Sequence, residues 1–324
     1  MPSVGPDEVL VRVEACGMCG SDIHFWEGSA PIPSPPITLG HEPAGVIAVV
    51  GVEVEGWREG DRVAVRAGAG CGQCRSCLAG DEPGCPRFRV LGMHIDGGFA
   101  QYLKAAAASL ICLPDAIPFE IGAILTDAVA TPFHAITDRG GLKPGERVAV
   151  FGCGGLGLHA VQIARLLGAA TVIAVDVRAA ALARAERAGA HHAIDASGEA
   201  PHRRIREITE GQGVDVALEF VGSAKTIGQA VGSLARGGRA VIVGMGVEPI
   251  QLPPPNVFVW SEFQVIGSFG STRANVESVL ELVAAGKLDL SESVTARLPL
   301  AEVNEGLRML HTKEGDPVRV VITP

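Results

Sequence analysis

Apolar and polar residues follow two different patterns along the chain, and the pattern changes near residue 128. Before that point the strand-like runs EVLVRVEA (8–15) and GVIAVVGVEVEGWREGDRVAV (45–65) are broken by Gly, Pro and Asp. Such short runs between turn residues predict a β-rich segment. The Pro-rich stretch PIPSPPITLGHE (31–42) cannot lie inside a helix or a central strand, so we expect a loop there.

From residue 128 onwards, short apolar strands alternate with Ala-rich segments of helical spacing. The predicted strands are RVAVFG (147–152), TVIAVD (171–176), DVALEF (215–220), GRAVIVGMG (238–246) and QVIGSFGST (264–272), and the predicted helices include LGLHAVQIARLLGA (156–169) and RAAALARAERAGA (178–190). This alternation predicts a parallel sheet covered by helices. Two helical patterns, 274–287 and 300–311, and a last strand, VRVVIT (318–323), follow. The fold class is therefore α/β, with domains predicted at 1–127 and 128–267 and a return to the first domain at 268–324.

Composition and charge exclude several classes of protein. The chain has 324 residues, of which 47% are hydrophobic, so a disordered chain is excluded and about two domains are expected. The formal net charge of -9 argues against nucleic-acid binding, which needs a basic face. The longest stretch without charged side chains, Val148–Ala164, holds four glycines and is a poor membrane span. No basic region followed by an apolar run opens the chain, so we predict no signal peptide and a cytoplasmic location.

A glycine-rich motif follows the first strand of the second region. It reads Gly152-Cys153-Gly154-Gly155-Leu156-Gly157, and Asp176 ends the next strand nineteen residues after Gly157. This is the context that a dinucleotide fingerprint requires, with the pyrophosphate at the helix N-terminus. The acidic Asp176, followed by Val177, would accept from ribose hydroxyls and repel a 2′-phosphate, which favours NAD over NADP. The alternative is a glycine-rich turn without a ligand.

Four of the eight cysteines are concentrated in one short segment. Cys71, Cys74, Cys77 and Cys85 have the spacing C-x2-C-x2-C-x7-C. Four thiolates in one lobe suit a closed tetrahedral zinc site that stabilises the fold. An iron–sulfur cluster is the alternative, because Pro86 follows the last cysteine, but the final gap is too long for the ferredoxin pattern. Four buried cysteines without a ligand are a third possibility.

A more dispersed set of candidate ligands lies in two other loops. Cys19-Gly20-Ser21-Asp22-Ile23-His24 follows the first strand, and Gly40-His41-Glu42 ends the Pro-rich loop. A Cys and a His from separate loops can share a metal and leave one position open. Spacing alone does not separate this hypothesis from a hydrogen-bonded structural histidine and a small buried cysteine.

Taken together, these motifs resemble the zinc-dependent medium-chain alcohol dehydrogenases over nearly the whole chain. The resemblance rests on CGxCGSDxH (16–24), GHE (40–42), GDRV (60–63), the four-cysteine lobe, DGGFAQY (96–102) and the GCGGLG fingerprint. It implies a GroES-like β-rich catalytic domain at 1–127 and 268–324, with the lobe at 71–85. It also implies a Rossmann NAD-binding domain at 128–267.

The resemblance implies a catalytic zinc held by Cys19, His41 and a third residue. That third ligand is usually a Cys, but the matching position here is Asp127, four residues before Thr131. Members that act on formaldehyde are similar here, whereas polyol-acting members use the Glu of GHE, so Glu42 is the competing ligand. An alternative for Asp127 is a helix N-cap before AVATPFHAI.

The family's relay implies that a proton leaves through Ser21, the nicotinamide ribose and His24. The residues expected to line the nicotinamide are Thr131, Val243, Gly244, Met245, Ser268 and Phe269. Arg319 matches a late arginine that pairs with the pyrophosphate. The alternative for Arg319 is an ordinary surface arginine on an edge strand.

The function implied is hydride transfer between NAD and an alcohol, with one catalytic and one structural zinc. Secondary alcohols, polyols and sugars are the expected substrates, and neither nucleic acid nor a membrane is an expected partner. Alternatives are a formaldehyde- or carbonyl-acting member, a zinc-free quinone or enoyl reductase of the same fold, and an NAD-binding, zinc-stabilised sensor or structural protein. A homo-tetramer or homo-dimer is expected, with QVIGSF (264–269) as the pairing edge.

Overall fold

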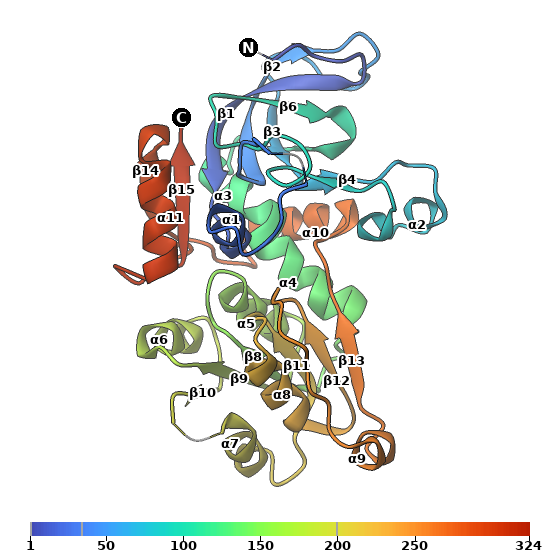
Figure 1. The fold of residues 1–324 in the computed structure, drawn as a ribbon, viewed down its shortest axis with the longest axis vertical. Coiled ribbons are helices and arrows are strands. Elements are labelled where there is room, and N and C mark those ends of the chain that lie inside the picture. The colour runs from blue at the N-terminus through green and yellow to red at the C-terminus, as the bar shows by residue number, and fades with distance from the viewer. Residues whose placement is uncertain (1, 34, 199) are drawn as a thin grey trace. The chain divides into compact units, whose positions relative to one another are not determined.

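A computed structural model describes residues 2–33, 35–198 and 200–324. Ser34, in the predicted Pro-rich loop, is thus outside the described residues. The chain forms two compact units, the first comprising Met1–Ala130 and Gly270–Pro324 and the second Thr131–Phe269 (Figure 1). The limits read from the sequence pattern, 127 and 267, differ from these by three and two residues (130 − 127 and 269 − 267).

The first unit is built on a mainly antiparallel sheet. Its strands are β1 (Glu8–Gly17), β2 (Glu42–Val50), β3 (Arg62–Val65), β6 (Tyr102–Ala106), β7 (Leu110–Cys112), β14 (Val294–Pro299) and β15 (Arg319–Thr323). They are ordered β14-β15-β1-β2-β3-β7, with β6 also paired to β1. A two-stranded sheet of β4 (Gly68–Ala69) and β5 (Arg89–Val90) carries the cysteine lobe between its strands. Alternating Val side chains of β1 and β3 fill the core together with Ile47 of β2.

Helices and short helical turns complete the first unit. They are α1 (Gly20–Trp26), α2 (Arg75–Leu78), α3 (Phe119–Ile124), α10 (Arg273–Ala284) and α11 (Val303–Thr312), with short turns η1 (Glu82–Gly84), η2 (Ala107–Ser109) and η5 (Leu300–Glu302). The C-terminal α11 packs against α1, because Gly306 leaves room for the buried Met18, whose Sδ would lie 2.7 Å from an added Cβ. The C-terminal segment therefore supports α1, the helix that Cys19 caps.

The second unit is a parallel sheet in the order β10-β9-β8-β11-β12-β13. Its strands are β8 (Arg147–Phe151), β9 (Thr171–Asp176), β10 (His192–Asp195), β11 (Val214–Glu219), β12 (Leu234–Ile242) and β13 (Gln264–Gly267). The helices are α5 (Gly157–Leu166), α6 (Ala179–Arg187), α7 (Pro201–Ile208), α8 (Ala224–Gly232) and α9 (Pro255–Trp260). This order, with a crossover at β8, is that of a doubly wound dinucleotide-binding fold and confirms the predicted fold class. The short edge strand β10 was not predicted, because its four residues carry little apolar pattern.

Two alternatives raised by the sequence are wrong. Asp127 is not a helix N-cap: the helix begins at Phe119, and Asp127 lies inside a π-helical turn, η3 (Leu125–Val129), before α4 (Ala130–His134) and a second such turn, η4 (Ala135–Arg139). Arg319 is not a surface residue on an edge strand, since β15 lies between β14 and β1 and the residue is only 2% exposed. Among the described residues, no helix is long and apolar enough to span a membrane.

Candidate metal and dinucleotide sites

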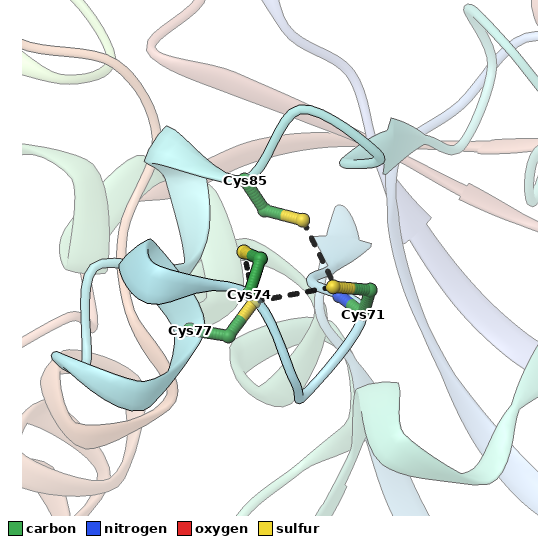
Figure 2. Close-up of side chains that lie close together, drawn as sticks. All are labelled: Cys71, Cys74, Cys77 and Cys85. Carbon is green, nitrogen blue, oxygen red and sulfur yellow. Dashed lines mark hydrogen bonds between the residues drawn. The ribbon is translucent and has the colours of Figure 1, made fainter.

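The four cysteines of the lobe converge on one point (Figure 2). The Sγ atom of Cys77 lies 3.5 Å from that of Cys74 and 4.0 Å from that of Cys71. In a tetrahedral site with zinc–sulfur bonds of about 2.3 Å, sulfurs are separated by about 3.8 Å. The thiols are free rather than disulfide-bonded, so the geometry fits a bound zinc ion.

Backbone amides prepare this lobe for a cation. The amide of Gln73 is the main cause that lowers the pKa of the Cys71 thiol to about 6, and the amide of Cys77 lowers the pKa of Cys74. The amides of Cys71 and Arg87 donate to the Sγ atom of Cys85 at 3.4 and 3.3 Å. Desolvation is the main cause that raises the pKa of the Cys77 thiol to about 11, so zinc binding there would release a proton.

A buried ion pair ties the lobe to the rest of the first unit. Glu82, in η1, pairs with Arg66, whose side chain is 3% exposed. Glu82 Oε2 also accepts from the amide of Arg273 at 2.9 Å, at the start of α10. Although partial burial would raise the pKa of Glu82, these partners lower it. The lobe is thus anchored by charge at the N-terminus of a helix that packs against η3.

Cys19, His41, Glu42 and Asp127 form a second cluster, with one ligand atom from each within 4.8 Å of the others. Asp127 Oδ2 lies 3.5 Å from Cys19 Sγ and 3.7 Å from His41 Nε2. Tetrahedral zinc with ordinary bond lengths separates sulfur and oxygen ligands by about 3.5 Å and nitrogen and oxygen ligands by about 3.3 Å. These three atoms therefore fit one zinc ion.

Asp22 supports this cluster, and the sequence interpretation gave it no role. Its wholly buried carboxylate lies 3.3 Å from His41 Nδ1 and accepts from the Cys19 amide at 2.9 Å. Burial alone would lower the pKa of His41, but Asp22 and Asp127 outweigh burial and raise it well above its usual value. A site that favours positive charge suits a divalent cation, and a carboxylate behind a histidine ligand fixes its tautomer. The position of this acidic residue within the CGSD motif is the sequence signal that could have indicated its role.

Glu42 differs from Asp127 in its partners. Its carboxylate is fully buried and forms an ion pair with Arg319 through Oε1. Within the described residues, Oε2 has no hydrogen-bond partner. One oxygen is thus committed to Arg319, and the other is a buried acceptor beside the cluster.

The two predicted relay residues lie on α1. Ser21 Oγ is 3.7 Å from Cys19 Sγ, and His24 follows three positions later on the same helix. The His24 ring is half-buried, with Nδ1 3.2 Å from Ser29 Oγ. A hydroxyl beside the metal cluster and an imidazole one turn away suit proton transfer towards solvent.

The glycine-rich loop has the conformation that a dinucleotide site needs. Gly152 has φ +86°, and a Cβ on Gly157 would lie 1.8 Å from the Gly152 carbonyl oxygen, so other residues do not fit there. The Asp176 carboxylate accepts from the amides of Cys153 at 2.8 Å and Arg178 at 2.9 Å. The N-cap of α5 is Leu156, whose apolar side chain cannot accept from the first amides of the helix, and a helix start of this kind suits a phosphate.

The residues expected around the nicotinamide lie on three segments of the second unit. Val243, Gly244 and Met245 follow β12, Ser268 and Phe269 follow β13, and Thr131 lies in α4. The Ser268 Oγ atom is buried and lacks a hydrogen-bond partner in the part of the chain that is described. A bound polar group would satisfy this hydroxyl, which fits a cofactor here. Val177, the other residue expected at the cofactor site, follows Asp176 and is 60% exposed.

Known proteins match both units. Residues 5–115 match the family model of the alcohol dehydrogenase GroES-like domain, and residues 155–285 match that of the zinc-binding dehydrogenases. Sorbitol dehydrogenase of Bacillus subtilis is 32% identical over 100% of this chain and 92% of its own length. An alcohol dehydrogenase of Geobacillus stearothermophilus is 36% identical over 94% of this chain and 88% of its own.

Solved structures agree in fold. The alcohol dehydrogenase TADH of Thermus sp. ATN1 has a TM-score of 0.92 at 31% identity, covering 100% of this chain and 94% of that one. The alcohol dehydrogenase of Aeropyrum pernix has a TM-score of 0.91 at 36% identity, with the same coverage of both chains.

Proposed function

The chain belongs to the zinc-dependent medium-chain alcohol dehydrogenase family, and on that basis we propose that it transfers a hydride between an alcohol and NAD. Secondary alcohols, polyols and sugars are the proposed substrates, and the cytoplasm the proposed location. The observation that carries the proposal is the cluster of Cys19, His41, Glu42 and Asp127. When bound, zinc supplies Lewis acidity to a hydroxyl oxygen and NAD accepts the hydride.

In this proposal Cys19, His41 and Asp127 hold the catalytic zinc, and the four-cysteine lobe holds a structural one. Asp127 is preferred to Glu42 because its Oδ2 lies 3.5 Å from Cys19 Sγ and 3.7 Å from His41 Nε2, whereas Glu42 already pairs with Arg319. Replacing Asp127 by Asn should lower zinc occupancy at this site, and replacing Glu42 by Gln should lower stability instead. A zinc content unchanged in the Asp127 variant and reduced in the Glu42 variant would reverse the assignment.

The chain's own side chains then have separate roles in the reaction. Ser21 relays the proton of the substrate hydroxyl, which its Oγ accepts as it gives up its own hydroxyl proton, since Oγ lies beside the zinc ligand Cys19. His24, on the same helix, passes the proton to solvent. Asp22 orients His41. The loop at 152–157 and Asp176 bind NAD, and Arg319 pairs with the pyrophosphate as well as with Glu42.

The experiment is a coupled test of substrate and metal. NADH formation is measured with ethanol, a secondary alcohol, sorbitol, L-threonine and formaldehyde, before and after treatment with a chelator. We expect turnover with at least one alcohol that is lost with the labile zinc and restored when zinc is added. NAD binding without turnover on any alcohol would favour the sensor alternative, and turnover insensitive to zinc would favour a zinc-free reductase.

We also propose that the protein pairs with a second copy through β13. This strand ends the parallel sheet, so its outer edge has no strand beside it among the described residues. The neighbouring segment exposes Val247, Val259 and Trp260, which are 89%, 72% and 77% exposed. An unpaired edge beside exposed apolar residues is a site for self-association. Sedimentation should give a dimer or tetramer, and a Val265→Pro variant should dissociate.

A further inference from the structure

Glu219 is a buried acid that the proposed chemistry leaves without a role. It ends β11, and its side chain is wholly buried, which raises the pKa of the carboxyl. The carboxylate accepts hydrogen bonds from the amides of Val221 at 3.0 Å and Gly222 at 2.9 Å. It also accepts from the Thr226 hydroxyl at 2.7 Å. One side chain therefore fixes the loop that follows β11.

The main chain of Glu219 holds the next loop as well. Its carbonyl oxygen accepts from the amides of Val243 at 2.8 Å and Gly244 at 3.0 Å, just after β12. The two loops are in direct backbone contact. A Cβ on Gly244 would lie 2.1 Å from the Gly222 nitrogen, and a Cβ on Gly222 would lie 2.6 Å from the Met245 carbonyl oxygen. A change in the loop after β11 must therefore move the loop after β12.

We infer that Glu219 is a positioning residue for the nicotinamide half of the cofactor, acting through residues 221–222 on residues 243–245. The inference rests on the proposed function, which assigns Val243, Gly244 and Met245 to the nicotinamide. The adenosine half is assigned to other loops, those after β8 and β9, where Asp176 holds the glycine-rich loop. The two halves of the cofactor site are thus supported by two different carboxylates.

Replacing Glu219 by Gln separates this role from simple space filling. The glutamine has nearly the same volume, but its amide group donates where the carboxylate accepts, and it carries no charge. The Gly222 amide contacts both carboxylate oxygens, at 2.9 and 3.1 Å, so one of these contacts is lost in either orientation of the amide. Bonds to a charged acceptor are also the stronger ones.

The test compares the binding of NAD with that of ADP-ribose, which lacks the nicotinamide. Calorimetric titrations use the zinc-loaded wild type, Glu219→Gln and a matched control, Glu210→Gln, in which the same chemical change is made at an exposed position. We expect Glu219→Gln to raise the Kd for NAD by about fivefold or more, within the usual range of coupling between sites. The Kd for ADP-ribose should change by less than about twofold, and the control should change neither.

Unchanged NAD binding in Glu219→Gln, or equal weakening of both ligands, overturns the inference, because the residue would then support the unit as a whole or not at all. If Glu219→Gln does not fold, Thr226→Val provides the second test. Its half-buried hydroxyl makes one of the bonds to Glu219, so a smaller loss confined to NAD is expected, with Thr226→Ser restoring the wild-type value. Loss confined to NAD supports the inference, and any other pattern overturns it. Failure of the wild type to bind NAD would instead refute the proposed function.

Discussion

The two clusters of metal ligands in the first unit are assembled in opposite ways. The four cysteines come from one stretch, residues 71–85, and their contacts are mostly with each other and with nearby backbone amides. Cys19, His41 and Asp127 come from three distant segments, and the buried carboxylate of Asp22 contacts both Cys19 and His41. A local cluster needs only its loop to form, whereas a dispersed one needs the whole unit to be folded.

This difference indicates where each cluster acts. A closed set of four thiolates leaves no position for a substrate and contributes stability. In the proposed catalytic site, Cys19, His41 and Asp127 would leave one of the four tetrahedral positions of the zinc open, and Ser21 Oγ lies 3.7 Å from Cys19 Sγ. We therefore expect damage to the lobe to change stability, and damage to the dispersed cluster to change turnover.

The largest expected effect is that of Cys19→Ser. It should lower kcat by about a thousandfold or more, because it removes a ligand of the zinc that stabilises charge on the reacting oxygen. NAD binding and one zinc per chain, that of the lobe, should remain. Metal analysis, NAD titration and turnover measure these three quantities. Cys16→Ser is the control, since that buried neighbour lies outside both clusters. Substantial activity in Cys19→Ser would remove Cys19 from the catalytic site.

Cys74→Ser tests the role of the four-cysteine lobe, as Cys19→Ser tests that of the dispersed cluster. Loss of one thiolate should release the structural zinc and lower the Tm by about 5–15 °C, as expected for several kcal/mol in a chain of this size. The turnover of molecules that remain folded should change by less than about threefold. The control is Cys112→Ser, an exposed cysteine outside both clusters. A loss of turnover at temperatures well below the Tm would mean that the lobe takes part in catalysis.

Asp22→Asn should have an intermediate effect, a loss of zinc affinity in the dispersed cluster. Asparagine can keep the hydrogen bond to the Cys19 amide, but it does not supply the charge beside His41. Changes behind a metal-bound histidine usually cost about 10- to 100-fold in metal affinity or activity. Competition with a chelator, followed by zinc content, measures this loss. Zinc affinity equal to that of the wild type would show that Asp22 serves only the backbone of α1.

The sequence predicted the local features well and the dispersed ones in part. Strand-to-helix alternation and the glycine-rich motif were sufficient for the order of the second unit, because a parallel sheet restricts the possible connections. The metal site of the lobe could equally be predicted, since its cysteines are close in the chain. The π-helical turn at Asp127 was not predicted, because its residues continue an ordinary helical pattern.

Long-range contacts explain the other misses. Arg319 and Glu42 are 277 residues apart, so no pattern within a window of sequence shows that they form an ion pair. The role of Asp22 depends on where the loop at 40–42 places His41, and that of Glu219 on how two loops after neighbouring strands meet. Such contacts depend on the folded arrangement of each unit rather than on local residue preferences.

The smallest expected effect concerns the link between the lobe and the rest of its unit. Glu82→Gln removes the charge that faces Arg66 and the start of α10, and should lower the free energy of unfolding by about 1–2 kcal/mol near neutral pH. Because its partners lower the pKa of Glu82, its stabilisation is present above the usual value of 4.5 and is lost as the pH falls through the folded-state pKa. The difference in stability between wild type and Glu82→Gln should therefore shrink on acidification.

Denaturant unfolding at neutral and at acidic pH measures this difference, with Glu55→Gln, at an exposed position, as the control. A difference that stays constant with pH would assign the effect to packing rather than to charge.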